Sequence, residues 1–298
     1  MENLIFAYMA SSGRPAREAL ILTRSIREFG GGYADSPVWI FNPDTNERIP
    51  DATVNELESL DARLIPFAVE EAIWKFPFAA KMYAAALAEE LAAGQAHFLL
   101  WMDTHAIVIQ EPGGLLPGTG KHLGYRPVDH TLIGSRMSEP IDGFWNLIYR
   151  ECGVREENLF PMTASVEGFE IRPYFNAGLV ACDPAKSIFG LCRDHFQRLY
   201  RDARFETFYE KDVRYRIFMH QAVLTGVILA ALKQEELEEF SHLINYPLHM
   251  HVDYPRERRP QSLNDLITIR YERFFQNPDW QDIIPVKEPL KSWLEEQF

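Results

Sequence analysis

Two side chains with metal-binding chemistry interrupt a long hydrophobic segment. Asp103 and His105 separate the apolar run 98–102 from a second apolar run, 106–109. On an extended segment, residues i and i+2 project to the same side, so one cation can contact both side chains. A carboxylate oxygen together with an imidazole nitrogen suits Mn²⁺ or another borderline divalent ion better than Ca²⁺. The pair therefore predicts a divalent cation site, and the simpler alternative is a capped turn between two strands.

The pattern around this pair is typical of parallel βαβ units. Short apolar runs alternate with segments of helical periodicity, which predicts strands at 4–9, 38–41, 64–66 and 97–102 and helices around 19–29 and 80–91. Strands that are buried on both faces read as continuous apolar runs. Ligands of open α/β sheets bind outside the carboxyl ends of the strands. Asp103 is therefore expected at a sheet edge that faces a crevice.

The second half of the chain is less regular. It predicts strands near 121–127, 172–184 and 266–272, and helices near 144–152, 188–199 and 220–232. No internal repeat, low-complexity tract or linker interrupts it. One continuous domain with two lobes is the expected organisation.

Composition narrows the class of protein. The 298-residue chain is 47% hydrophobic, enough to bury a substantial core. Its formal net charge of -13 argues against general binding of nucleic acid or anionic membranes, because phosphate contacts need clustered Lys and Arg. Three cysteines without framework or metal spacing predict reduced thiols. With no signal-peptide pattern and no run of about 18 apolar residues, a cytoplasmic protein without a transmembrane segment is expected.

Four segments, in order, resemble one family of enzymes. They are "LTRSIREFGGGYADSPVWIF" (22–41), "FLLWMDTHAIVIQEP" (98–112), "YFNAGLVACDP" (174–184) and "MHQAVLTGVI" (219–228). Together they resemble GT-A fold glycosyltransferases, particularly family 8, over about residues 3–275. The resemblance implies an α/β fold with a mixed, mostly parallel central sheet flanked by helices. It also implies a single domain over 1–298, with a nucleotide-binding lobe in 1–112 and an acceptor-side lobe in 113–298.

The resemblance implies a nucleotide-sugar donor, UDP-linked, and a hydroxyl acceptor. In the family, a D-x-D motif binds Mn²⁺ or Mg²⁺ on the donor diphosphate, where a cation stabilises the charge that develops on the leaving group. Asp103 and His105 match the two acidic positions, and His105 is a departure. A D-x-H version occurs among polypeptide N-acetylgalactosaminyltransferases, with His as a ligand.

A second departure affects the same predicted metal site. Many relatives supply a further His ligand from a late strand, but "ITIRYERF" has Arg270 at that position. Arginine cannot bind a metal, although it can hold a diphosphate through its guanidinium fork. Two interpretations follow. Either His249 or His251 completes the metal site, or Arg270 partly replaces the metal ion in stabilising the diphosphate, and metal dependence is weak. An exposed loop is the plain alternative for the two histidines.

The resemblance also implies the residues that bind the donor sugar. Asn176 and Gly178 match a turn beside the sugar, where Asn can bond hydroxyls and Gly allows close backbone approach. A β-bulge capped by Asn176 is the structural alternative. Lys81 matches a basic donor contact, with a solvated helix lysine as the alternative. Tyr8, at the end of the first strand, is a candidate for stacking on the nucleobase or for core packing.

His220 and Gln221 are the catalytic candidates. They replace the family's Asp-Gln, so Gln221 can still bond a sugar hydroxyl while a candidate carboxylate is lost. A neutral His220 could take a proton from the acceptor, and a first-turn residue of an apolar helix is the alternative. Trp145 and Tyr149 are candidates for an acceptor platform or for the core.

Glycosyl transfer is the function that these residues favour. A non-catalytic relative that binds nucleotide sugars or glycans is the second interpretation, favoured by the departures at His105, His220 and Arg270. A sugar nucleotidyltransferase is a third, but the segment 11–14 is a poor match to the Gly-rich, Arg-bearing loop that such enzymes carry.

Overall fold

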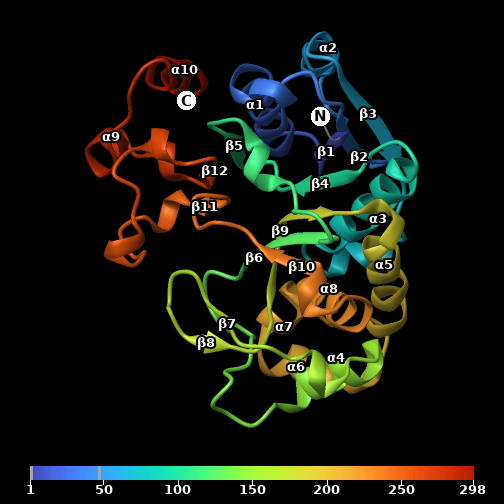
Figure 1. Cartoon of the computed structure of the whole chain (residues 1–298). Coiled ribbons are helices and arrows are strands. Elements are labelled where there is room, and N and C mark those ends of the chain that lie inside the picture. The colour runs from blue at the N-terminus through green and yellow to red at the C-terminus, as the bar shows by residue number, and fades with distance from the viewer. Residues whose placement is uncertain (1–2, 46–47) are drawn as a thin grey trace.

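A seven-stranded sheet forms the centre of the computed structural model, which describes residues 3–45 and 48–298 (Figure 1). Residues 1–2, at the start of the N-terminal segment without a signal-peptide pattern, lie outside the described residues. The strand order is β10 (Leu237–Glu239), β6 (Leu123–Pro127), β9 (Phe175–Cys182), β4 (Phe98–Met102), β1 (Leu4–Met9), β2 (Val38–Pro43) and β3 (Ala62–Phe67). All neighbouring strands are parallel except β9, which is antiparallel to β4 and β6. The predicted mixed, mostly parallel sheet is confirmed.

Helices cover both faces of this sheet because successive side chains of each strand point to opposite faces. Leu4 and Phe6 of β1 pack in one hydrophobic cluster with α1 (Arg14–Phe29), and Ile5 and Ala7 pack in another with α3 (Ala79–Ala92). The second cluster also includes α4 (Gly143–Cys152), α5 (Ile188–Leu199) and α8 (Met219–Ala231). Five residues of β4 are buried without interruption, as expected of a strand between two helical layers.

A small three-stranded sheet extends the chain beyond Asp103. Its order is β11 (Tyr246–Pro247), β12 (Thr268–Arg270) and β5 (Ala106–Val108). β12 runs antiparallel to β5 and pairs Arg270 with Ala106, so the late strand lies directly beside the D-x-H segment. The Tyr271 N–H donates to the His105 carbonyl at 3.0 Å and continues this contact.

The remaining elements are short or peripheral. They are α2 (Asp51–Ser59), β7 (Met162–Thr163), β8 (Glu170–Ile171), α6 (Glu206–Lys211), α7 (Val213–Ile217), α9 (Trp280–Ile283) and α10 (Leu290–Gln297). The C-terminal helix α10 lies beside α1 (Figure 1), where Arg17 donates to the Gln297 carbonyl at 2.8 Å. In the described part of the chain, no helix combines the length and apolarity needed to cross a membrane.

A buried carboxyl group joins α3 to α5. Glu89 is 2% exposed, and it accepts hydrogen bonds from Gly190 N–H at 2.8 Å and from the Cys182 thiol at 3.7 Å. Burial raises the pKa of Glu89 to about 7, and the backbone donors at the start of α5 only partly offset this. The folded protein therefore binds a proton at Glu89 more tightly than the unfolded chain does.

This proton uptake predicts a pH-dependent stability. The protonated carboxyl stabilises the fold below the ordinary pKa of 4.5, and that contribution is lost as pH rises towards 7. The Glu89→Gln variant keeps an acceptor and cannot ionise, so its stability relative to the wild type should rise by about 3 kcal/mol between about pH 4.5 and pH 8. Urea unfolding of both proteins at the two pH values measures this difference. If the difference in unfolding free energy between the two proteins is the same at both pH values, Glu89 does not titrate in this range.

Candidate active site

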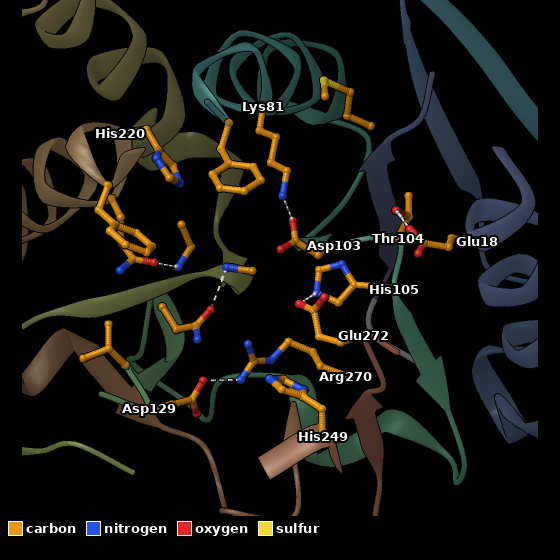
Figure 2. Close-up of a pocket in the computed structure, with 18 of the residues that line it drawn as sticks. Glu18, Lys81, Asp103, Thr104, His105, Asp129, His220, His249, Arg270 and Glu272 are labelled. Atoms are coloured by element: carbon orange, nitrogen blue, oxygen red, sulfur yellow. Dashed lines mark hydrogen bonds and ion pairs between the residues drawn. The ribbon is translucent and has the colours of Figure 1, made fainter. Parts of the chain in front are cut away.

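A pocket of about 530 Å³ opens where β4 and β1 end (Figure 2). Nine predicted site residues line it: Lys81, Asp103, His105, Asn176, Gly178, His220, Gln221, His249 and Arg270. They come from both halves of the chain. Asp103 thus faces a crevice at the carboxyl end of a buried strand, as the sequence predicts.

Asp103 is bound by protein groups from two sides. Its backbone N–H donates to the Gly178 carbonyl at 2.8 Å, and its side-chain Oδ1 accepts from Lys81 Nζ at 2.5 Å. Only 14% of the Asp103 side chain is exposed. Burial raises the pKa of this carboxyl, but the positive charges of Lys81 and His105 outweigh burial and hold the pKa below its ordinary value. Asp103 is therefore an ionised, paired carboxylate at neutral pH.

His105 is paired with a carboxylate from the late strand region. Its Nε2 lies 3.2 Å from Glu272 Oε1, two residues after the end of β12. The hydrogen bond from His105 lowers the pKa of Glu272 to about 2, against the effect of burial. The nitrogen that could bind a metal thus already contacts an ionised protein group.

Arg270 forms a third pair, with Asp129. Its Nη2 donates to the Asp129 carboxylate, and both side chains are almost buried. The Arg270 Nε–H is also buried but has no hydrogen-bond partner, and neither does Nδ1 of the neighbouring His249. A buried donor without a partner is costly, so the Arg270 Nε–H marks a place where a ligand with an acceptor atom would be stabilised.

A bulge brings the "FNAG" turn against Asp103. The pairing of β6 with β9 shifts between Tyr125 and Pro127, and Gly178 N–H donates to Asn176 Oδ1 at 2.8 Å. Gln221 Oε1 accepts from Ala177 N–H at 3.0 Å and holds the same turn. The capped bulge, which the sequence offers as the structural alternative, is therefore also a wall of the pocket.

His220 lies at the start of α8 and is almost fully buried. Its Nδ1 lies 3.1 Å from the Ile217 carbonyl, which can only accept, so this bond requires the proton on Nδ1 and leaves the Nε2 lone pair available. Burial and the charge of Lys81 lower the pKa of His220 to about 4. The imidazole is therefore neutral at physiological pH.

Two predicted site residues do not line the pocket. Tyr8 is fully buried, its hydroxyl bonds Thr23 Oγ1 at 2.5 Å, and its ring faces α1, so the predicted stacking on a nucleobase is wrong. His251 lies beyond a 3₁₀ turn, where its Nδ1 bonds the Tyr246 hydroxyl at 3.0 Å. It cannot join Asp103 in this structure. Trp145 and Tyr149 are core residues, 1% and 6% exposed.

Other pocket residues were not predicted. Asp129 follows β6 as Asp103 follows β4, and this shared position after a strand was the available signal. Glu18 of α1 accepts from Thr104 Oγ1 at 3.1 Å and from Arg14 Nε at 2.5 Å. Phe78 lines the pocket with 48% of its surface exposed and with a left-handed backbone (φ 66°), a strained conformation that often occurs at functional sites.

The described residues do not fit the predicted metal site. Asp103 and His105 already contact Lys81 and Glu272, and Arg270, at the position where the resemblance to family 8 enzymes implies a further ligand, cannot bind a metal ion. Across residues 3–45 and 48–298, no group of three His, Cys, Asp or Glu side chains is arranged to hold a metal ion. The metal set of Asp103, His105, His249 and His251 is therefore not assembled.

Comparison with known proteins decides the family. The model of the Rhodobacterales glycosyltransferase domain matches residues 6–231. The chain belongs to this glycosyltransferase family. It is thus an enzyme of the glycosyltransferase class, while no curated protein matches it.

One solved structure agrees with the GT-A fold. An active-site mutant of LgtC is similar at a TM-score of 0.50 and 11% identity, covering 97% of this chain and 99% of LgtC. Galactosyltransferase LgtC in complex with donor and acceptor sugar analogues gives a TM-score of 0.49 at 12% identity, with the same coverage. The glycosyltransferase GlyE of Streptococcus pneumoniae TIGR4 gives 0.48 at 13% identity, covering 100% of this chain and 60% of GlyE.

Because β9 lies so close to Asp103, we expect that Gly178 cannot be replaced by a larger residue without a loss of stability. A Cβ atom added at Gly178 would lie 3.0 Å from both Asp103 Oδ2 and Asn176 Oδ1. The Gly178→Ala variant should therefore lose about 1–3 kcal/mol of stability through overpacking. Gly113→Ala is the matched control, because no atom lies within 4 Å of its added Cβ. Urea unfolding tests both variants, and equal stabilities would contradict the tight contact at Gly178.

Proposed function

We propose that this glycosyltransferase moves a sugar from a UDP-linked donor to a hydroxyl acceptor. The observation that carries the proposal is a pocket in which fixed cations and neutral hydrogen-bonding groups face each other. Lys81 and Arg270 supply the positive charge, and Asn176 and Gln221 supply the neutral groups. A nucleotide sugar needs both, because its diphosphate is anionic and its sugar is rich in hydroxyls.

The cations act on the leaving group. During transfer, the bond between the anomeric carbon and the diphosphate oxygen breaks, and the nucleoside diphosphate departs with the bonding electrons. Positive groups that are already in place stabilise this charge without reorganisation at the moment of reaction. Lys81 and Arg270 are suited to this role, since both are held in place by carboxylates.

The acceptor side is more apolar. Phe78, Leu132 and Phe218 line the pocket together with His220, and the Phe78 ring centroid lies 5.7 Å from that of His220. An exposed aromatic face can pack on the C–H face of a sugar ring. The His220 Nε2 lone pair can accept a hydrogen bond from the attacking hydroxyl, although a pKa of about 4 makes it a weak base. The departing phosphate is then the stronger candidate to receive the proton.

One observation favours the alternative of a binding protein without transfer activity. Each carboxylate that lines the pocket contacts a cationic or imidazole partner: Glu18 contacts Arg14, Asp103 contacts Lys81, Asp129 contacts Arg270, and Glu272 contacts His105. Among the described pocket residues, no carboxylate is therefore available as a nucleophile or base without first breaking a pair.

A panel of nucleotide sugars tests the proposal. A UDP-sugar is expected to raise the melting temperature more than GDP-, CMP- and ADP-sugars do, because only the correct base and sugar complete the contacts. Release of free UDP from the best ligand, in the presence of mixed sugar acceptors, distinguishes transfer from binding. Stabilisation without UDP release would favour the binding protein, and stabilisation by no member of the panel would exclude the proposed donor.

The apolar side of the pocket predicts that loss of Phe78 weakens acceptor binding more than donor binding. Phe78→Ala removes the exposed ring at the pocket, so the KM for the acceptor should rise about tenfold, in line with roughly 1 kcal/mol or more of aromatic contact. The Kd for the UDP-sugar should change by a smaller factor, because Phe78 affects the donor only through Lys81, whose Nζ lies 4.7 Å from the ring centroid. Trp74→Ala is the control, because Trp74 is also exposed (45%) but does not line the pocket. An equal rise in the acceptor KM of both variants, or a loss of donor binding in Phe78→Ala, would contradict this role of Phe78.

A further inference from the structure

We infer that this enzyme binds the donor diphosphate without a divalent metal ion, with Lys81 and Arg270 as permanent cations in its place. The inference rests on the proposed nucleotide-sugar site and concerns how that site holds the diphosphate. It departs from the Mn²⁺ or Mg²⁺ that the resemblance to family 8 enzymes implies.

The first argument is that Asp103 already has its counter-ion. Lys81 Nζ lies 2.5 Å from Asp103 Oδ1, with 21% and 14% of the two side chains exposed. Water screens such a sheltered pair only weakly. A metal ion on Asp103 would have to displace the ammonium group or lie beside it, against the repulsion of like charges. Figure 2 shows the Lys81 side chain reaching from α3 to this carboxylate.

The second argument concerns the other side chains near Asp103. His105 Nε2 is engaged by Glu272, and the position that supplies a third ligand in relatives is Arg270, which never has a free lone pair. Among the described residues, hydrogen-bond donors for a phosphate group are therefore more available than ligands for a metal ion.

The third argument is that both cations keep donors for a ligand. An ammonium group has three N–H donors, and one contact at Lys81 is to Asp103. Arg270 contacts Asp129 through Nη2, while its buried Nε–H is unsatisfied. Phosphate oxygens are strong acceptors for such charge-assisted bonds. Asp103 and Asp129 then act as positioning residues that hold the two cations in the pocket.

The test is a set of calorimetric titrations with UDP. Wild-type protein stripped with EDTA should bind UDP, and added Mn²⁺ or Mg²⁺ should change the Kd by less than about threefold. Lys81→Met should weaken UDP binding at least tenfold, with or without metal. Lys75→Met is the matched control, since Lys75 is exposed, lies just before α3 and does not line the pocket. It should bind UDP as the wild type does.

Removal of either cation alone would leave a sheltered carboxylate without a partner, so Lys81→Met is also measured together with Asp103→Asn, and Arg270 is changed only together with Asp129. The double variant Arg270→Met, Asp129→Asn avoids that cost and should also bind UDP at least tenfold more weakly, with a circular dichroism spectrum like that of the wild type.

The outcomes separate this inference from the proposed function. Loss of UDP binding in EDTA and its return with Mn²⁺ would overturn the metal-free site and leave the UDP-sugar donor intact. Unchanged binding in Lys81→Met would also overturn it. Binding of neither UDP nor a UDP-sugar, with or without metal, would overturn the donor site itself and this inference with it.

Discussion

The ion pair between Asp103 and Lys81 is the constraint around which the pocket is built. A strand that is buried on both faces ends in a carboxylate, and a sheltered carboxylate is costly unless a cation or hydrogen-bond donors compensate it. Lys81 supplies the cation from the first turn of α3, and Gly178 allows β9 to approach closely enough to cover the other side. The β9 bulge, the start of α3 and the end of β4 are thereby held together at one point.

The need to compensate sheltered carboxylates extends to the whole pocket. Each carboxylate in its wall contacts a Lys, Arg or His side chain, although the whole chain carries a net charge of -13. An anionic ligand entering such a site finds cations that are already oriented. Oriented cations of this kind can bind a small anion, while the overall acidic character of the chain is unfavourable for extended polyanions such as nucleic acid.

The arrangement of the pocket gives one explanation for the two departures from the family pattern, His105 and Arg270. His105 and Arg270 stand at positions for which the resemblance to family 8 enzymes implies metal ligands, and β5 and β12 lie side by side, with Ala106 opposite Arg270. A change at one position alters what the other can do, because the two strands share the same wall. The substitution of a guanidinium for an imidazole is thus consistent with a site in which protein cations, held by Asp103 and Asp129, do the electrostatic work.

The sequence by itself determined the layered α/β fold, the strand that ends at Asp103 and the segments that reach its edge. These features depend on local hydrophobic periodicity, which neighbouring residues encode. Only the tertiary structure decided which charges meet, since Lys81 and Asp103 are 22 residues apart and Asp129 and Arg270 are 141 apart. It also decided that Tyr8 faces α1 rather than the pocket, because an apolar run buried on both faces carries no sign of which face is which.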